Sequence, residues 1–157
     1  MTATEPSGLP LLTWAVSTSD GETVRGPLPA WAADDPSKTD VAPCRLAAEL
    51  ADITHYAEMA GLIMPVSRGQ DPAEPSVVLS VSIQSKPFPE AGEPGIPMVH
   101  VQIADDFWIT NLDPDAVAEF GQRLRALADR IITTAAPALT AARVDWARHY
   151  PASVLQS

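Results

Sequence analysis

The chain has 157 residues, 46% of them hydrophobic, and a formal net charge of −10 at pH 7. This length and composition predict a single domain, residues 1–157, and argue against wholesale disorder. The acidic charge repels phosphate backbones, so no nucleic acid is expected as a partner. One cysteine excludes an internal disulfide. We find no secretory signal and no run of about 20 apolar residues, so we expect no membrane contact and a cytoplasmic location.

The first part of the chain is predicted to be strands and loops. Thirteen of its sixteen prolines lie at or before Pro97, and proline disfavours helix interiors. Apolar alternation around Trp14 and an Asp20-Gly21 pair predict a hairpin. Residues 1–9 are expected to be disordered, and loops are expected at 26–43 and 67–76. A short helix near 44–52 is expected to be followed by an irregular or extended stretch to Val66.

Two strands are predicted near the middle of the chain, at 77–84 and 98–103. In both segments, apolar and polar side chains alternate with a period of two. That period predicts antiparallel strands with one buried face and one wetter face, the latter carrying His100. The side chains expected to face the core are Val77, Leu79, Val81, Ile83, Val99, Val101 and Ile103. Phe107 and Trp108 are placed after the last strand.

The stretch from Leu112 to Ile131 is predicted to be a helix. Asp113 suits the N-cap, and Pro114 suits the first helical position. Apolar residues then recur at intervals of 3, 4, 3 and 4, at Val117, Phe120, Leu124, Leu127 and Ile131, which predicts one apolar stripe.

We expect that helix, 114–133, to close the core of the sheet. Pro137 is expected to kink or break the helix before a second helical segment at 138–149. The predicted fold class is α+β: an antiparallel sheet of about four strands, a C-terminal helix packed across one face, and a second short helix after Pro137.

The sequence offers little for catalysis or metal binding. Cys44 and His55 have no Gly-rich flank that would serve a nucleophile, and a lone cysteine is typical of a small buried hydrophobe. Cys44, His55, His100 and His149 match no zinc spacing. The Asp105-Asp106 pair would chelate poorly on a strand, since neighbours there point to opposite faces. We expect no catalytic residue, no metal and no cofactor.

Two sets of residues are candidates for binding. One is a pocket that would use His55 and Trp108. The other is an interface at Trp146, because the chain is acidic up to residue 122 and basic beyond it, which favours a protein partner or a homodimer. The pocket candidates are Asp52, His55, Tyr56, Asp105, Asp106 and Trp108.

Several segments resemble an uncharacterised family of small acidic actinobacterial proteins, a domain of unknown function. They are "ADITHYAE", "VVLSVSI", "VHVQIADDFWITNLDPDAVAEFGQRLRALADRI" and "ARVDWARH". The resemblance covers roughly residues 31–149 and implies a strand pair followed by a helix. Related members carry a Cys-Pro-x-Trp-Cys segment, and Leu28 and Ala32 stand where its cysteines would be. Any metal or redox role of those cysteines therefore cannot be carried over to this chain.

These observations favour a non-enzymatic accessory or regulatory protein that acts through protein contacts. The alternative is a small-molecule-binding module or minor enzyme with a pocket near His55 and Trp108. A third class, an acidic mimic of nucleic acid, would require the acidic side chains to form a continuous stripe.

Overall fold

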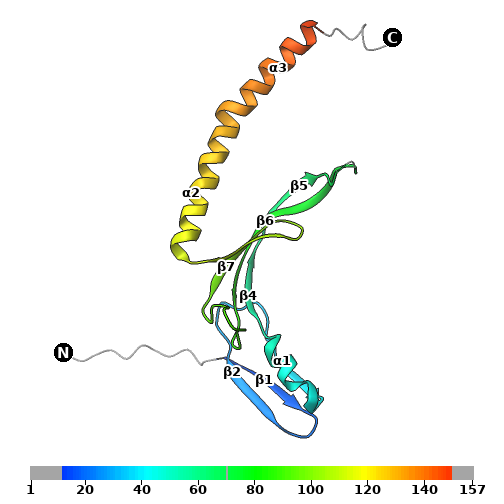
Figure 1. Ribbon diagram of the computed structural model, residues 1–157, viewed down its shortest axis with the longest axis vertical. Helices are drawn as coiled ribbons and strands as arrows, with labels where there is room; N and C mark the ends of the chain where they lie inside the picture. The colour runs from blue at the N-terminus through cyan, green and yellow to red at the C-terminus, as the bar shows by residue number, and fades with distance from the viewer. Residues whose placement is uncertain (1–11, 70, 150–157) are drawn as a thin grey trace, which may run out of the picture. The chain divides into compact units, whose positions relative to one another are not determined.

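The computed structural model describes residues 12–69 and 71–149 (Figure 1). The chain forms two compact units, one up to Pro114 and one from Asp115 onward. The fold is α+β, as predicted: mostly antiparallel strands, a short early helix and a long C-terminal helix. Residues 1–9, expected to be disordered, lie outside the described residues.

A three-stranded sheet begins the first unit. Strands β1 (Thr13–Thr18) and β2 (Thr23–Pro27) form the predicted antiparallel hairpin. Its turn contains Gly21 at φ +100°, a backbone region that favours glycine. Strand β3 (Lys38–Val41) pairs in parallel with β1, although residues 26–43 were predicted to be a loop. Ser37 positions β3, because its Oγ accepts a hydrogen bond of 2.9 Å from the amide of Ala15.

The buried core of the first unit lies beside β1. A 3₁₀ helix, η1 (Pro43–Arg45), leads into helix α1 (Leu46–Ala51), close to the predicted 44–52. Trp14, Val16, Leu46 and Ile53 form one buried cluster. Cys44 is exposed on η1, so its predicted burial is wrong; the 3₁₀ turn leaves its side chain outside this cluster.

A five-stranded antiparallel sheet follows, with the order β4-β6-β7-β8 and with β5 also paired to β6. The stretch to Val66 resolves into two strands, and a further strand begins at Phe107, where the sequence analysis had placed the end of the sheet. Val81 pairs with Val101, and Ile83 with Val99. Of the seven side chains predicted to face the core, Val101 is buried, Val77 is exposed and the other five are half-buried. The five strands are β4 (His55–Met59), β5 (Leu62–Val66), β6 (Glu74–Ser85), β7 (Met98–Ala104) and β8 (Phe107–Leu112).

Strand β6 is interrupted at Leu79, which has φ +56°. Gly61, between β4 and β5, lies against this point: a Cβ there would lie 2.5 Å from the Val78 carbonyl oxygen. The interruption disturbs the alternation expected for a regular strand, and Val77 is 50% exposed. The predicted burial of Val77 is therefore wrong, because a regular period of two does not extend through a residue with positive φ.

Beyond Leu79 the hairpin continues as a two-stranded arm, defined here as residues 62–69 and 71–77 (Figure 1). Only β5 pairs with this part of β6, since the β7 register begins at Val78. The expected loop at 67–76 is shorter than predicted, because β6 already begins at Glu74. Leu62, Ile63 and Met64 are exposed on the arm.

The second unit is helical from the end of the first to His149. Helix α2 (Pro114–Arg130) leads into a π-helical turn (Ile131–Ala135) and then helix α3 (Ala136–His149), without an intervening loop. Pro137 was expected to kink or break the helix; the helix does not break there, and a π turn lies directly before the proline. In the wider π turn the Ala136 amide donates to the carbonyl of Ile131, and this local spacing accommodates a proline that cannot donate.

No side chain of α2 or α3 is buried among the described residues. Phe120 and Leu124 are half-buried, whereas Leu127 is 45% exposed, so its predicted burial is wrong. None of the helices in the described part of the chain has the length and apolar character needed to cross a membrane.

Candidate functional site

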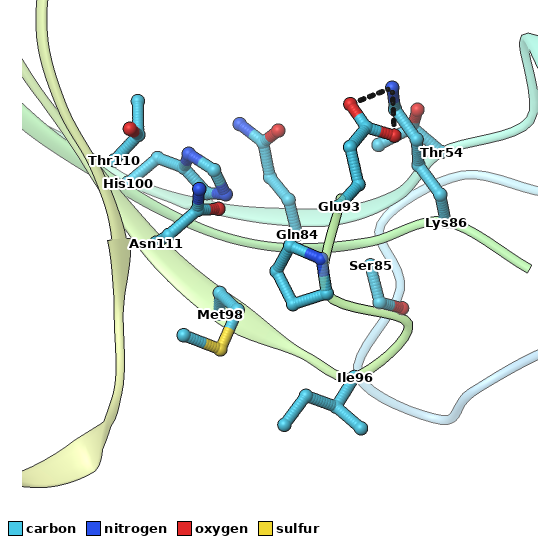
Figure 2. Close-up of a pocket in the computed structure, with 11 residues that line it drawn as sticks. Thr54, Gln84, Ser85, Lys86, Glu93, Ile96, Met98, His100, Thr110 and Asn111 are labelled. Atoms are coloured by element: carbon cyan, nitrogen blue, oxygen red, sulfur yellow. Dashed lines mark hydrogen bonds and ion pairs between the residues drawn. The ribbon is translucent and has the colours of Figure 1, made fainter. Parts of the chain in front are cut away.

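A cavity of about 330 Å³ lies in the first unit, on the polar face of the five-stranded sheet. Strands β6, β7 and β8 provide one wall, and the loop between β6 and β7 folds over it (Figure 2). The lining mixes apolar side chains with neutral hydrogen-bonding groups and one ion pair. The lining residues are Thr54, Gln84, Ser85, Lys86, Glu93, Pro94, Ile96, Met98, His100, Thr110 and Asn111.

The neutral polar groups of the cavity gather around His100. Figure 2 shows His100, Asn111 and Thr110 near one another, with Met98 also close to Asn111. Burial lowers the pKa of His100 below its ordinary value, so its imidazole is neutral at pH 7. One of its ring nitrogens can therefore donate a hydrogen bond and the other accept one. The set suits an uncharged polar ligand.

In the ion pair at the cavity, the charges of Lys86 and Glu93 neutralise each other. Lys86 Nζ donates to both carboxylate oxygens of Glu93, at 2.8 and 3.0 Å. The amide of Glu90 also donates to Glu93, at 3.0 Å. Lys86 lowers the pKa of Glu93, and Glu93 raises the pKa of Lys86. The pair therefore stays ionised near neutral pH and holds the loop in place.

The cavity has no catalytic arrangement that we can assemble. A general base needs a nucleophile within hydrogen-bond reach and a group that orients it. Within residues 12–69 and 71–149, His100 makes no hydrogen bond to a carboxylate or a hydroxyl. The same residues contain no group of three or more His, Cys, Asp or Glu side chains able to hold a metal ion.

His55, the centre of the predicted pocket, is a buried residue outside the cavity. It is 4% exposed at the start of β4, and its Nδ1 has no hydrogen-bond partner among the described residues. Burial lowers the pKa of this imidazole, so it is neutral at pH 7. Asp52, the C-cap of α1, is exposed.

Tyr56 connects the two sheets of the first unit. Its hydroxyl donates a hydrogen bond to Asp34, and its carbonyl accepts one from the amide of Ala33 at 2.7 Å. The Asp34 carboxylate raises the pKa of the Tyr56 phenol. These bonds fix the loop before β3 against β4.

The other predicted pocket residues lie at the opposite end of the five-stranded sheet. Asp105 and Asp106 form the turn between β7 and β8, and Trp108 is exposed on β8. Asp105 accepts two hydrogen bonds from Arg68 of the arm, one of them at 2.9 Å from Nε. The structure thus brings Asp105, Asp106 and Trp108 near one another but not into the cavity.

The residues that do line the cavity carried a weak signal in the sequence. His100 was assigned to the wetter face of its strand, which is the face the cavity uses. Thr110 and Asn111 were missed because β8 was not expected. Nothing in the composition of the loop between β6 and β7 showed that it would fold over the strands.

The helical unit presents a second candidate surface, an apolar stripe along one face. Leu127, Ile131, Leu139 and Trp146 are each at least 45% exposed. Exposed apolar surface of this extent is uncommon unless it contacts another surface. The residues that form the stripe are Val117, Phe120, Leu124, Leu127, Ile131, Ala135, Leu139, Ala142 and Trp146.

The π turn keeps the two halves of the stripe on one face. From Ile131 to Leu139 the apolar positions are eight residues apart, one more than a heptad. In a regular α-helix the extra residue would rotate Leu139 by about 100° from the heptad position. A π turn accommodates one extra residue, and it lies at Ile131–Ala135. The stripe therefore continues from α2 into α3.

Comparison with known proteins identifies a family but no activity. No curated protein and no solved structure matches the chain. The family described as a domain of unknown function, DUF6907, matches residues 13–141. That match includes all the strands, helices α1 and α2 and the start of α3. The chain belongs to the DUF6907 family.

Proposed function

We propose that this protein is a non-enzymatic accessory or regulatory protein that works by binding a protein chain along the stripe. The observation that carries the proposal is the continuity of the stripe through the π turn. Nine apolar positions stay on one face over a helical run that includes a proline. A helix that served only as a connection would not need this alignment.

The residues around the stripe support a protein partner. A continuous 3-4 spacing is the pattern by which helices pack against one another, with each apolar side chain entering a gap on the facing helix. Tryptophan and arginine are enriched at the centres of protein interfaces. Trp146 lies on the stripe, and Arg143 directly follows the stripe residue Ala142 in the sequence. Both side chains are exposed.

Site-specific photo-crosslinking tests the proposal. A photoreactive amino acid is placed at Leu127, on the stripe, or at Gln122, on the opposite side of α2, in cells that naturally produce the chain. We expect adducts with another polypeptide chain, a second copy included, from position 127 and none from position 122. Equal yields at the two positions, or intermolecular adducts at neither, would contradict the proposal.

A second candidate function, binding of a small molecule, is favoured by the cavity at His100. Its neutral hydrogen-bonding groups and the apolar Met98 and Ile96 suit a small uncharged amide or alcohol. Titration of the protein with small amides, followed by NMR of the His100 ring, tests this function. Saturable shifts at His100 that are absent at exposed His149 would support it, and no shift at either ring would oppose it.

A further inference from the structure

We infer that the occupant of the stripe is a second copy of this chain, lying antiparallel along the helix. This inference rests on the proposed function, because it names the partner for the same surface. The evidence is a symmetry in the spacing of the stripe, together with the sizes and charges of the residues that this symmetry brings together.

From Phe120 to Trp146, the spacing of the stripe is the same when it is read in either direction. Residue 133 is the centre of the π turn Ile131–Ala135. Each apolar position from Phe120 to Ile131 has an apolar counterpart at the same number of residues after it, whereas Val117 has none, because residue 149 is a histidine. The counterparts are Ile131 with Ala135, Leu127 with Leu139, Leu124 with Ala142, and Phe120 with Trp146.

A stripe with this symmetry fits a reversed copy of itself. In a two-fold symmetric dimer, if residue i contacts residue j, then residue j contacts residue i. Two helices crossing antiparallel at residue 133 would bring every counterpart pair together twice. The extra residue of the π turn falls at the crossing point of both helices, so the two stripes stay matched on either side of it.

Side-chain sizes also favour the antiparallel arrangement. It places Leu124 against Ala142 and Ile131 against Ala135, one large residue and one small residue in each pair. Phe120 would meet Trp146, and aromatic pairs are favourable contacts. A parallel, in-register pair would instead set each alanine against an alanine and leave space between the helices, which costs packing energy.

Charge agrees with the same alignment. Arg123 and Asp145 each precede a stripe residue, Leu124 and Trp146. In the antiparallel pair, Arg123 of one copy would lie beside Asp145 of the other, at the flanking positions where helix pairs choose their orientation. Both side chains are exposed. The acidic start of α2, with Asp115 and Glu119, would also face the basic end of α3 in the other copy.

Cysteine crosslinking distinguishes the orientations. The background variant is Cys44→Ser, which removes the exposed native thiol, and Leu124→Cys or Ala142→Cys is added to it. In the antiparallel pair residue 124 of one chain lies near residue 142 of the other, and each is roughly 27 Å from its own equivalent along the helix axis. We therefore expect a disulfide dimer when the two variants are mixed, and no dimer from either variant alone.

Other outcomes would overturn the inference. Self-crosslinking of each variant alone would show a parallel pair. Absence of a crosslink, with sedimentation showing a monomer at high micromolar concentration, would show that no second copy occupies the stripe. Photo-adducts at position 127 with a different protein would then retain the proposed function, whereas the absence of any intermolecular adduct would remove both.

A charge exchange gives a second readout that does not depend on cysteine chemistry. Arg123→Asp should raise the dissociation constant of the dimer several-fold, because it brings two acidic side chains together. Adding Asp145→Arg should restore the original value. Circular dichroism checks that each variant keeps its helix content. A double variant that binds no better than Arg123→Asp alone would contradict the antiparallel alignment.

Discussion

The three-stranded sheet and the arm of the five-stranded sheet use their apolar residues in opposite ways. In the three-stranded sheet, Trp14 and Val16 of β1 are at most 1% exposed and lie in one cluster with Leu46 and Ile53. In the five-stranded sheet, the arm exposes Ile63 to 74% and Val77 to 50%. The hydrophobic content of a strand therefore does not show how much that strand contributes to stability.

The difference follows from what covers each strand. Helix α1 and the segment after it place Leu46 and Ile53 against β1, whereas the arm is a ribbon of two strands only. A two-stranded hairpin is at most marginally stable in water without further packing. We therefore expect substitutions near β1 to change the stability of the fold strongly and substitutions on the arm to change it little.

The largest expected effect is at Gly26, opposite Trp14 in the β1–β2 register. A Cβ at this position would lie 2.3 Å from Cζ2 of the Trp14 ring. Because Trp14 is buried, its ring has little room to move. Gly26→Ala should lower the free energy of unfolding by about 1–3 kcal/mol, the usual cost of overpacking, measured by urea denaturation.

Gly121→Ala is the matched control for this substitution. A Cβ at Gly121 meets no atom within 4 Å, and alanine favours a helix over glycine by roughly 0.5–1 kcal/mol. The control should therefore be neutral or slightly stabilising. A Gly26→Ala variant as stable as the control would show that the Trp14 cluster is not the tightly packed part of the molecule.

Local periodicity predicted much of this arrangement. The hairpin around Asp20-Gly21, the short helix, strands β6 and β7 and the long helix all follow from alternation, turn residues or 3-4 spacing. What it missed depends on contacts between distant parts of the chain. Strand β3 exists because β1 pairs with it, and the irregularity at Leu79 lies against Gly61, 18 residues earlier.

In the two candidate sites, too, local spacing predicted some features, and contacts between distant parts of the chain determine the others. The stripe was visible as far as Ile131, because its spacing is local. Its continuation past Pro137 was not predicted, because Pro137 was expected to kink or break the helix, whereas the π turn at Ile131–Ala135 carries the helix on. The cavity could not be predicted, because β8 supplies Thr110 and Asn111 and a loop covers His100. The sequence analysis placed His55 in a pocket, whereas in the structure it is a buried residue outside the cavity.

The second expected effect is a loss of stability in mild acid, caused partly by His55 beside the core. Burial lowers the pKa of His55 in the folded chain, and that of His100 likewise, whereas in the unfolded chain each is about 6.5. The unfolded chain therefore takes up protons first as the pH falls. The contribution of each neutral imidazole is fully present above pH 6.5 and is lost as the pH drops below it.

Urea denaturation between pH 7.5 and pH 5.5 measures this loss. His55→Gln removes one titrating group and should flatten the profile relative to the unmodified chain. His149→Gln, at an exposed position of α3, is the control and should leave the slope unchanged. A slope unaffected by His55→Gln would mean that this imidazole is not kept neutral by the fold. Carboxylates such as Glu49, whose pKa is lowered by Lys38, cause a further loss of stability at lower pH, where they become protonated.

The smallest expected effect is on the arm, and one substitution made in both sheets measures the contrast directly. Valine and threonine have nearly the same shape, so Val→Thr changes polarity and leaves volume almost unchanged. At Val16, which is 0% exposed, a new hydroxyl loses its contact with water and should cost about 1–3 kcal/mol. At Val77, half exposed on the arm, the hydroxyl remains hydrated and the change should stay within about 0.5 kcal/mol. Equal losses at the two positions, measured by urea denaturation, would mean that the arm is covered in solution and belongs to the folded core.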